Sequence, residues 1–352
     1  MEYYNQIPDY KIETDQPAPI GYPESETPDA YTPEPEERDS RLAFLDFCKT
    51  NPAPANTKAV YYEIARLAAG GRPHHGILHA GLDYIDQRKD CADFVMHSIL
   101  WLLYRFRDHP RLKDDFIIRA ESSILKFKYW PSEPGIDSMC TWTENHQILF
   151  ASAAFLAGQM FPGSLFSNSG RTGAELIEVH RKRIITWLEL RFKTGFSEYL
   201  SNVYYDEDIT ALLSLIEFSQ DEEIVERSKI VLDLMLMDMA LNSWKGIFGS
   251  THGRSYSHSK MDLTMDGTNN TLKVLFGMGQ FSSFDNMSAV PLAISQNYEA
   301  PPLIEAIAQD LKRSEMINRQ RMGIKLDDAD RWGLSYDNFE DAMVFLSLEA
   351  YL

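Results

Sequence analysis

Residues 91–107, CADFVMHSILWLLYRFR, indicate the fold class of this 352-residue chain. Their apolar side chains recur at the spacing of an α-helix and lie on one broad face. That face consists of Phe94, Val95, Ile99, Leu102, Leu103 and Phe106. The segment therefore predicts a helix, and segments with the same spacing follow along the chain from Arg41 onward.

Helical spacing predicts further helices over about 59–68, 110–127, 143–160, 172–192, 206–219, 221–242, 268–277 and 338–352, and another after Pro301. Thr172 and Glu175 have the spacing of a capping box. The helix over 143–160 has small residues on one side, which would let a neighbouring helix approach closely.

Strand signals are sparse, because no window combines sustained β-branched alternation with hairpin turns. A chain of about ten to twelve helices predicts an all-α fold of antiparallel helical hairpins arranged as an (α/α) toroid. A regular solenoid is disfavoured, because no repeat of fixed period is found.

Residues 1–38 contain seven of the 17 prolines, many acidic residues and no apolar periodicity. Such a segment buries too little apolar surface to offset its ordering entropy, so we expect an acidic arm or linker. Residues 39–352 are expected to form the helical domain. The apolar pattern still runs at Leu352, so we expect this domain to extend past that residue.

Charge and cysteine content exclude several classes of function. The net charge of -18 repels nucleic-acid phosphates and anionic membrane surfaces, so neither partner is expected. Cys48, Cys91 and Cys140 are widely spaced without a CxxC motif, which indicates neither a disulfide framework nor a structural zinc site.

No apolar run is long enough to span a membrane and no signal peptide is evident, so a cytoplasmic location is expected unless an export signal has been removed.

The first candidate for a functional segment is 142–147, WTENHQ, at the start of the predicted 143–160 helix. Thr143 and Glu144 suit a helix cap and the positive end of the helix dipole. Capping does not explain Asn145 and His146, which at a helix start facing a cavity would bind an anionic oxygen and move a proton.

The second candidate is 251–258, THGRSYSH, in a long polar segment that follows Trp244. In extended backbone His252, Arg254, Tyr256 and His258 project to the same side. The simpler interpretation is an exposed loop, but such loops favour Lys, Glu, Asp and Gly over this mixture.

The third candidate is 196–208, between two predicted helices. Tyr204 and Tyr205 are candidate stacking platforms for a sugar ring, or one of them a proton donor. The alternative is that 206–208 is a plain acidic helix start with aromatic side chains packed beneath the loop.

No metal or cofactor is expected. His75 and His79 have the i,i+4 spacing of a helical metal-binding pair, but no third-ligand motif accompanies them. The DDAD sequence at 327–330 lacks a partner motif, and 277–279, GMG, lacks the strand and helix of a nucleotide-binding fold.

The Asn145-His146 pair and the later loop with His252, Arg254 and Tyr256 resemble motifs of the (α/α)-toroid polysaccharide lyases, which include chondroitin AC, hyaluronate and alginate lyases. The resemblance covers about 20 residues and keeps the order of the motifs only roughly. It implies neutralisation of a uronate carboxylate by Asn, Arg or His, removal of the C5 proton by His or Tyr, and protonation of the leaving oxygen by Tyr. Those lyases usually carry an export signal and a C-terminal β-sandwich, and this sequence shows neither.

The expected function is therefore a polysaccharide lyase that cleaves an acidic, uronic-acid-containing oligo- or polysaccharide by β-elimination. The catalytic candidates, left unranked, are His146 or His252 as base and Tyr256 or Tyr204 as acid. The candidates for substrate binding are Trp142, Glu144, Asn145, Asn202, Tyr205, Arg254 and His258.

Two alternatives stay open from the sequence. One is an (α/α) glycoside hydrolase in which Glu144 and either Glu198 or Asp208 are acid and base. The other is a non-catalytic scaffold whose aromatic loops bind a glycan or a protein. The sugar, the position of cleavage and the oligomeric state are not specified by the sequence.

Overall fold

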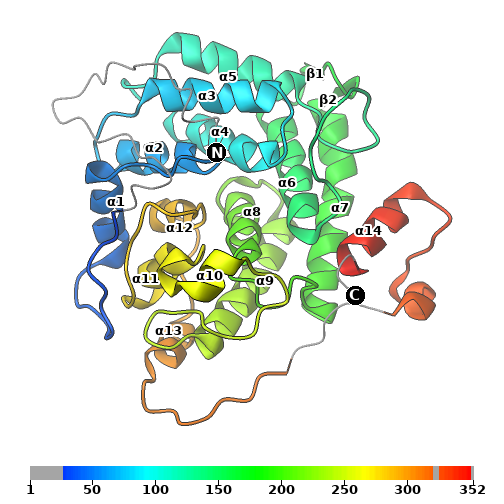
Figure 1. Cartoon of the computed structure of the whole chain (residues 1–352). Coiled ribbons are helices and arrows are strands. Elements are labelled where there is room, and N and C mark those ends of the chain that lie inside the picture. The colour runs from blue at the N-terminus through cyan, green and yellow to red at the C-terminus, as the bar shows by residue number, and fades with distance from the viewer. Residues whose placement is uncertain (1–26, 320–324, 350–352) are drawn as a thin grey trace.

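The computed structural model describes residues 27–319 and 325–349, and it confirms the all-α prediction (Figure 1). Its α-helices are α1 (Ser40–Thr50), α2 (Ala59–Ala68), α3 (His75–Asp86), α4 (Ala92–Phe106), α5 (Asp114–Lys126), α6 (Glu144–Met160), α7 (Gly173–Thr194), α8 (Tyr204–Phe218), α9 (Glu222–Asn242), α10 (Ser257–Met261), α11 (Asn269–Phe276), α12 (Ala289–Ile294), α13 (Pro302–Gln309) and α14 (Phe339–Glu349). Two 3₁₀ segments, η2 (Leu263–Met265) and η3 (Leu326–Trp332), complete the helical elements. The strands β1 (Leu165–Phe166) and β2 (Arg171–Thr172) form one small antiparallel pair between α6 and α7.

Among the described elements, five helices contact one another in a closed series. α2 packs on α4, α4 on α6, α6 on α8, α8 on α12, and α12 returns to α2. We call these five the inner helices, since most of their residues are buried all round the helix, as in 59–67 of α2 and 144–158 of α6. The other helices lie outside them: α3 on α4, α7 on α6, α9 on α8 and α1 on α12.

The inner helices begin at the same end of the domain. Lys58, just before α2, binds Asp206 in the first turn of α8, with 2.9 Å between Nζ and Oδ2. Asp93 in the first turn of α4 binds His146 in the first turn of α6 at 2.6 Å. The backbone N–H of Ser288, which precedes α12, donates to Asp206 Oδ1 at 2.8 Å.

Polar contacts also join the opposite ends of these helices. Arg105 in the last turn of α4 donates to Glu217 in the last turn of α8 at 2.8 Å. Ser295, directly after α12, donates to the same carboxylate at 2.8 Å. The inner helices are therefore parallel, and the outer helices α3 and α7 each return the chain from the end of one inner helix to the end where the next one starts.

One of the small residues of α6, Gly158, lies directly against α7. A Cβ atom on Gly158 would lie 2.6 Å from the carbonyl oxygen of Gly173 and 3.2 Å from Ile177. These distances are shorter than ordinary van der Waals contact, so any larger residue at Gly158 would push the two helices apart. α5 begins at Asp114 rather than at Pro110 as predicted, because Lys113 is extended and two aspartates follow it at the positive end of the helix.

The described part of the acidic arm lies against the domain. Thr32 pairs with Gly279 through an isolated β-bridge, and Asp29 accepts a hydrogen bond from the buried Lys273 ammonium at 2.8 Å. Tyr31 donates its hydroxyl proton to the carbonyl oxygen of Lys245. Residues 27–38 are thus held by specific contacts, while residues 1–26 of the predicted arm lie outside the described residues.

The predicted capping box of α7 is confirmed. The Thr172 hydroxyl accepts from the Glu175 backbone N–H, and Glu175 accepts in turn from the Thr172 N–H at 2.7 Å.

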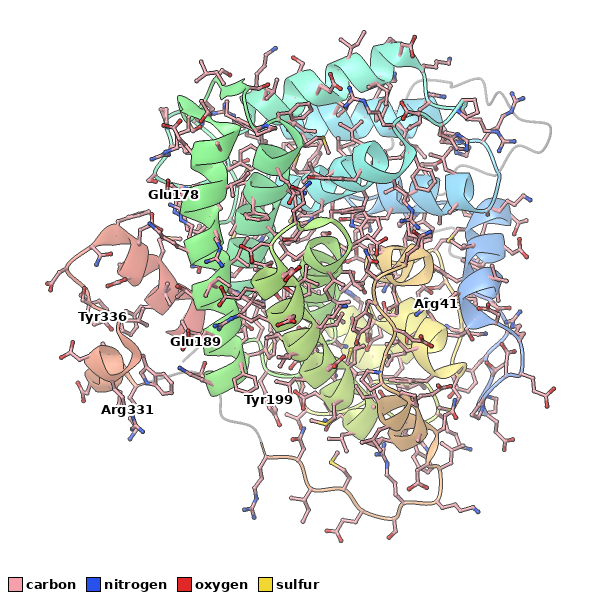
Figure 2. The ribbon with its side chains drawn as sticks, turned by 180° about the vertical axis from the view of Figure 1, so that it is seen from behind. Arg41, Glu178, Glu189, Tyr199, Arg331 and Tyr336 are labelled. Carbon is pink, nitrogen blue, oxygen red and sulfur yellow. The ribbon has the colours of Figure 1, made fainter. Side chains whose placement is uncertain are left out.

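We expect Thr172→Ala to lower the free energy of unfolding by about 1 kcal/mol, because the Glu175 N–H at the helix start loses the hydroxyl that accepts its hydrogen bond. Urea unfolding followed by circular dichroism measures the change. The matched control is Glu178→Ala in the same helix, labelled in Figure 2, where the side chain is 77% exposed. The control should stay within about 0.5 kcal/mol of the wild type; equal losses in the two variants would contradict the capping role.

Candidate functional site

The three predicted segments meet at one carboxylate, that of Glu198. Asn145 Nδ2 donates to Glu198 Oε2 at 2.6 Å, and Arg254 Nη1 donates to Oε1 at 2.8 Å. Glu198 lies in the loop before α8, Asn145 in the first turn of α6, and Arg254 in the long loop before α10. A single buried acid therefore joins segments that are separated by more than fifty residues in the sequence.

Glu144 holds the Glu198 loop in place. Its Oε1 accepts from the Glu198 backbone N–H at 2.8 Å, and its Oε2 accepts from the backbone N–H and the hydroxyl of Ser197, both at 2.9 Å. Arg191 of α7 neutralises the same carboxylate. Glu144 is completely buried, so these contacts give it a structural role rather than one in substrate binding.

Two tyrosines extend the site towards the surface. The hydroxyl oxygens of Tyr204 and Tyr256 lie 2.5 Å apart, and the Arg254 guanidinium lies over the Tyr204 ring, 3.9 Å from its centroid. Burial, together with the hydrogen bond to Tyr256, raises the pKa of Tyr204 far above its ordinary value. Tyr204 therefore stays protonated and can donate to the Tyr256 oxygen. We call Asn145, Glu198, Tyr204, Arg254 and Tyr256 the Glu198 cluster.

The outer side of the Glu198 cluster is aromatic and cationic. Tyr256 is 45% exposed, and the Arg254 side chain is 30% exposed. The exposed His258 ring stacks on Tyr256 with 5.6 Å between centroids and 18° between planes. His258 lies in α10, which begins at Ser257, so the extended backbone predicted for 251–258 does not reach it. A ligand at this face would meet a guanidinium, a phenol and an imidazole. The Trp142 side chain, just before the start of α6, is 49% exposed.

Carboxylates lie beneath this face. Glu198 and Asp208 are both completely buried. Burial and the neighbouring Glu144 charge raise the pKa of Glu198 to about 7. Burial, with the charges of Glu144 and Glu198, also raises the pKa of Asp208.

His146 has a different environment from its neighbour Asn145. Its Nδ1 lies 2.6 Å from Asp93 Oδ2, and its ring stacks on Phe94 with 5.2 Å between centroids. Burial opposes the charged imidazolium, but the Asp93 carboxylate outweighs burial and holds the pKa of His146 well above its ordinary value. A buried imidazolium paired in this way is a poor acceptor for a substrate proton.

His252 and Tyr205 support the loop between α7 and α8. His252 Nδ1 donates to the carbonyl oxygen of Leu200, and the imidazole packs edge-on against the Phe248 ring with 5.3 Å between centroids. Burial lowers the pKa of His252. The fully buried Tyr205 accepts from the Leu200 N–H at 3.3 Å. Both side chains therefore contact backbone rather than the exposed face of the Glu198 cluster.

Asn202 connects this loop to the long polar segment. Its Nδ2 donates to Asp266 Oδ2 at 2.9 Å, and Asp266 also accepts from the hydroxyl of Thr268 at 2.6 Å. Burial raises the pKa of Asp266 to about 6. Asn202 is itself 1% exposed, so it positions the loops rather than presenting an amide to solvent.

A second charged cluster next to the site was missed by the sequence analysis. The buried Lys58 ammonium lies 2.9 Å from Asp206, 2.8 Å from Glu207 and 3.3 Å from Asp285. Burial raises the pKa of Glu207 to about 8, although Lys58 acts in the opposite direction. Lys58 has no sequence motif around it, so only the fold reveals its partners.

Possible metal ligands also gather at the start of α6. Asp90, Cys91 and His146 place ligand atoms within 4.8 Å of one another. The cysteine spacing gave no sign of this group. His75 and His79, for which the sequence predicts no metal site, lie elsewhere: His75 Nε2 is 2.9 Å from the Arg111 carbonyl, and His79 Nε2 is 3.9 Å from Asp115.

Comparison of the chain with protein-family models, with curated proteins and with solved structures gave no match. No helix among the described residues is both long and apolar enough to cross a membrane.

The pKa of Glu198 predicts how its replacement changes stability with pH. The Glu198 carboxyl has a pKa near 4.5 in the unfolded chain and about 7 in the folded protein. Between these pH values the unfolded chain has lost this proton while the folded protein still holds it. The contribution of Glu198 to the free energy of unfolding therefore falls as pH rises from 4.5 to 7. The stability of Glu198→Gln relative to the wild type should therefore rise from pH 4.5 to pH 7. Urea unfolding at several pH values measures this difference.

The control is Glu189→Gln on α7, labelled in Figure 2. A hydrogen bond from Lys193 lowers the pKa of Glu189, so the relative stability of this variant should stay level or fall as pH rises. A level profile for Glu198→Gln would show that Glu198 is not held as a buried acid.

Proposed function

We propose that this chain is a polysaccharide lyase that cleaves a uronic-acid-containing glycan by β-elimination at the exposed face of the Glu198 cluster. The observation that carries this proposal is the placement of Arg254, which Glu198 holds at 2.8 Å and Tyr204 stacks against, beside the exposed phenol of Tyr256. A guanidinium fixed on two sides is preorganised to bind a sugar carboxylate.

The exposed groups suffice for each proton transfer. Arg254 neutralises the uronate carboxylate and so makes the C5 proton more acidic. His258 takes that proton, the C5 electron pair forms the C4–C5 double bond, and the bond from C4 to the glycosidic oxygen breaks. Tyr256 gives its proton to the departing oxygen, and the Tyr204 hydroxyl stabilises the resulting phenolate through the short contact between the two hydroxyls. Transfer of the proton from His258 through solvent to Tyr256 restores the starting state.

The helix arrangement supports the same proposal. The closed series of contacts among α2, α4, α6, α8 and α12, with the other helices outside, is what an (α/α) toroid requires. The Glu198 cluster lies where the inner helices α6 and α8 begin. The resemblance to the toroidal lyases, which rests on short motifs, thus agrees with the position of those motifs in the fold.

Burial argues against the glycoside hydrolase alternative. A hydrolase needs two carboxyl groups in contact with the glycosidic bond or its attacking water. Glu144, Glu198 and Asp208 are all completely buried behind the tyrosines and Arg254. A glycan at the exposed face would therefore meet Tyr256 and Arg254 before any of these acids.

A screen on alginate, hyaluronate, chondroitin and polygalacturonate tests the proposal. A lyase produces an unsaturated uronide, which absorbs ultraviolet light, and consumes no water. Reducing ends without that absorbance would instead support a hydrolase. Binding without either product would support the non-catalytic scaffold.

Once a substrate is found, we expect Tyr256→Phe to lower kcat by about 10²–10⁴-fold, because the departing oxygen loses its proton donor. Initial rates of ultraviolet absorbance measure this loss. The control is Tyr336→Phe, an exposed tyrosine labelled in Figure 2 that packs on Phe345 near α14. The control should keep the wild-type rate; a Tyr256→Phe variant that also keeps it would exclude this residue as the acid.

The two histidines of the long loop provide a further prediction. His258→Gln should lower kcat by about 10²-fold or more, because it removes the exposed base. His252→Gln should chiefly lower the thermal midpoint, since His252 contacts the Leu200 carbonyl and the Phe248 ring. The reverse pattern, with His252→Gln inactive and His258→Gln active, would assign the base to His252.

A further inference from the structure

Four side chains with metal-ligand chemistry lie near the start of α6. Asp90, Cys91 and His146 place their ligand atoms within 4.8 Å of one another. Cys140 adjoins them, because its side chain is close enough to the His146 ring to help raise the pKa of that ring. The four residues come from the loop before α4, the loop before α6 and α6 itself.

The loops that carry these residues are joined by backbone contacts. The Cys140 N–H donates to Asp90 Oδ1 at 2.9 Å, and the Ser138 N–H donates to the Arg88 carbonyl at 3.2 Å. The Asp90 carboxylate has two oxygens, so one oxygen can accept the hydrogen bond from the Cys140 N–H while the other binds a metal. The ligands are therefore held close together by contacts that do not use the thiols.

His146 has the second partner that zinc-bound histidines commonly have. Its Nδ1 bonds to the fully buried Asp93 at 2.6 Å, which leaves Nε2 as the nitrogen that can bind a metal. An imidazole bound on one side by a carboxylate and on the other by zinc is a recurrent arrangement, in which the carboxylate fixes the orientation of the ring.

Cys91 is held in a conformation that only few residues adopt. Its φ is +65°, in the left-handed region, directly before the first turn of α4. A residue other than Gly or Asn in this region is disfavoured, so the surrounding structure must hold it there. This conformation places the Cys91 side chain beside Asp90 and His146.

We propose that Asp90, Cys91, Cys140 and His146 bind one Zn²⁺ ion in a structural site. Two thiolates, one imidazole and one carboxylate are the donor types that zinc takes in four-coordinate protein sites. Bonds of about 2.0–2.3 Å in a tetrahedron put the donor atoms roughly 3.3–3.8 Å apart, within the spread of the three already gathered. The ion would bind the loops before α4 and α6 to the helix start that carries Asn145. This inference does not depend on the proposed lyase activity.

The metal content of the full chain tests the site. The protein is purified without chelators, incubated with zinc chloride, freed of excess metal and measured by mass spectrometry of the elements. We expect about one zinc per chain. Replacement by Co²⁺ should give thiolate-to-cobalt charge transfer in the near ultraviolet and the visible bands of tetrahedral cobalt.

Variants locate the ligands. Cys91→Ser and Cys140→Ser should each lose the bound zinc and weaken the cobalt charge-transfer band. Cys48→Ala is the matched control, because Cys48 is buried in α1, outside this group of ligands, and this variant should keep one zinc. Asp93→Asn keeps all four ligands and should weaken zinc binding by about 10–100-fold in competition with a chromogenic chelator.

Several results would overturn the site. Wild-type protein without stoichiometric zinc and without cobalt bands would do so, as would full zinc binding by Cys91→Ser. A disulfide between Cys91 and Cys140 in protein prepared under reducing conditions would also exclude it. If a cysteine variant fails to fold, as judged by circular dichroism, the wild-type cobalt spectrum and the Asp93→Asn affinity decide the question.

Discussion

The structure depends on the convergence of the N-terminal ends of the inner helices. Each helix start carries partial positive charge and N–H groups that have no partner within the helix. Burial would remove the water molecules that could otherwise accept hydrogen bonds from these groups. The protein satisfies them with acids: Asp206 of α8 accepts from the backbone N–H groups of Met287 and Ser288 before α12 and also binds Lys58 before α2. This end of the domain is therefore a polar interior, in which each buried charge must have a charged or hydrogen-bonding partner.

That constraint also arranges the candidate site in two layers. Glu144 and Glu198 lie below, where backbone N–H groups, Arg191 and Asn145 bind them. Arg254 covers Glu198 and compensates its charge, and the same contact fixes the guanidinium next to Tyr256. The buried acids are thus support for the cationic and aromatic side chains above them, and the lyase chemistry that we propose uses the upper layer.

The sequence predicted the elements of this arrangement better than its contacts. Helical spacing located the long helices, and the 3.6-residue period needs no tertiary information. It missed α12, which is short and contains Pro291, and it gave no expectation for α3 as part of the core. The three functional segments could be selected because caps and exposure did not account for their residues. Their individual roles could not, since the surroundings that distinguish Asn145 from His146 come from Glu198 and Asp93, more than fifty residues away.

The first turn of α6 joins the two proposed sites. Successive residues of a helix project about 100° apart, so Asn145 and His146 necessarily face different neighbours. Asn145 faces the Glu198 cluster, while His146 faces Asp93 and the two cysteines. A zinc ion bound to His146 would fix the rotation of this turn, and thereby the direction in which the Asn145 amide points. His146, one of the two histidines that the sequence offers as a base, would then act through geometry, by holding the residue beside it in place.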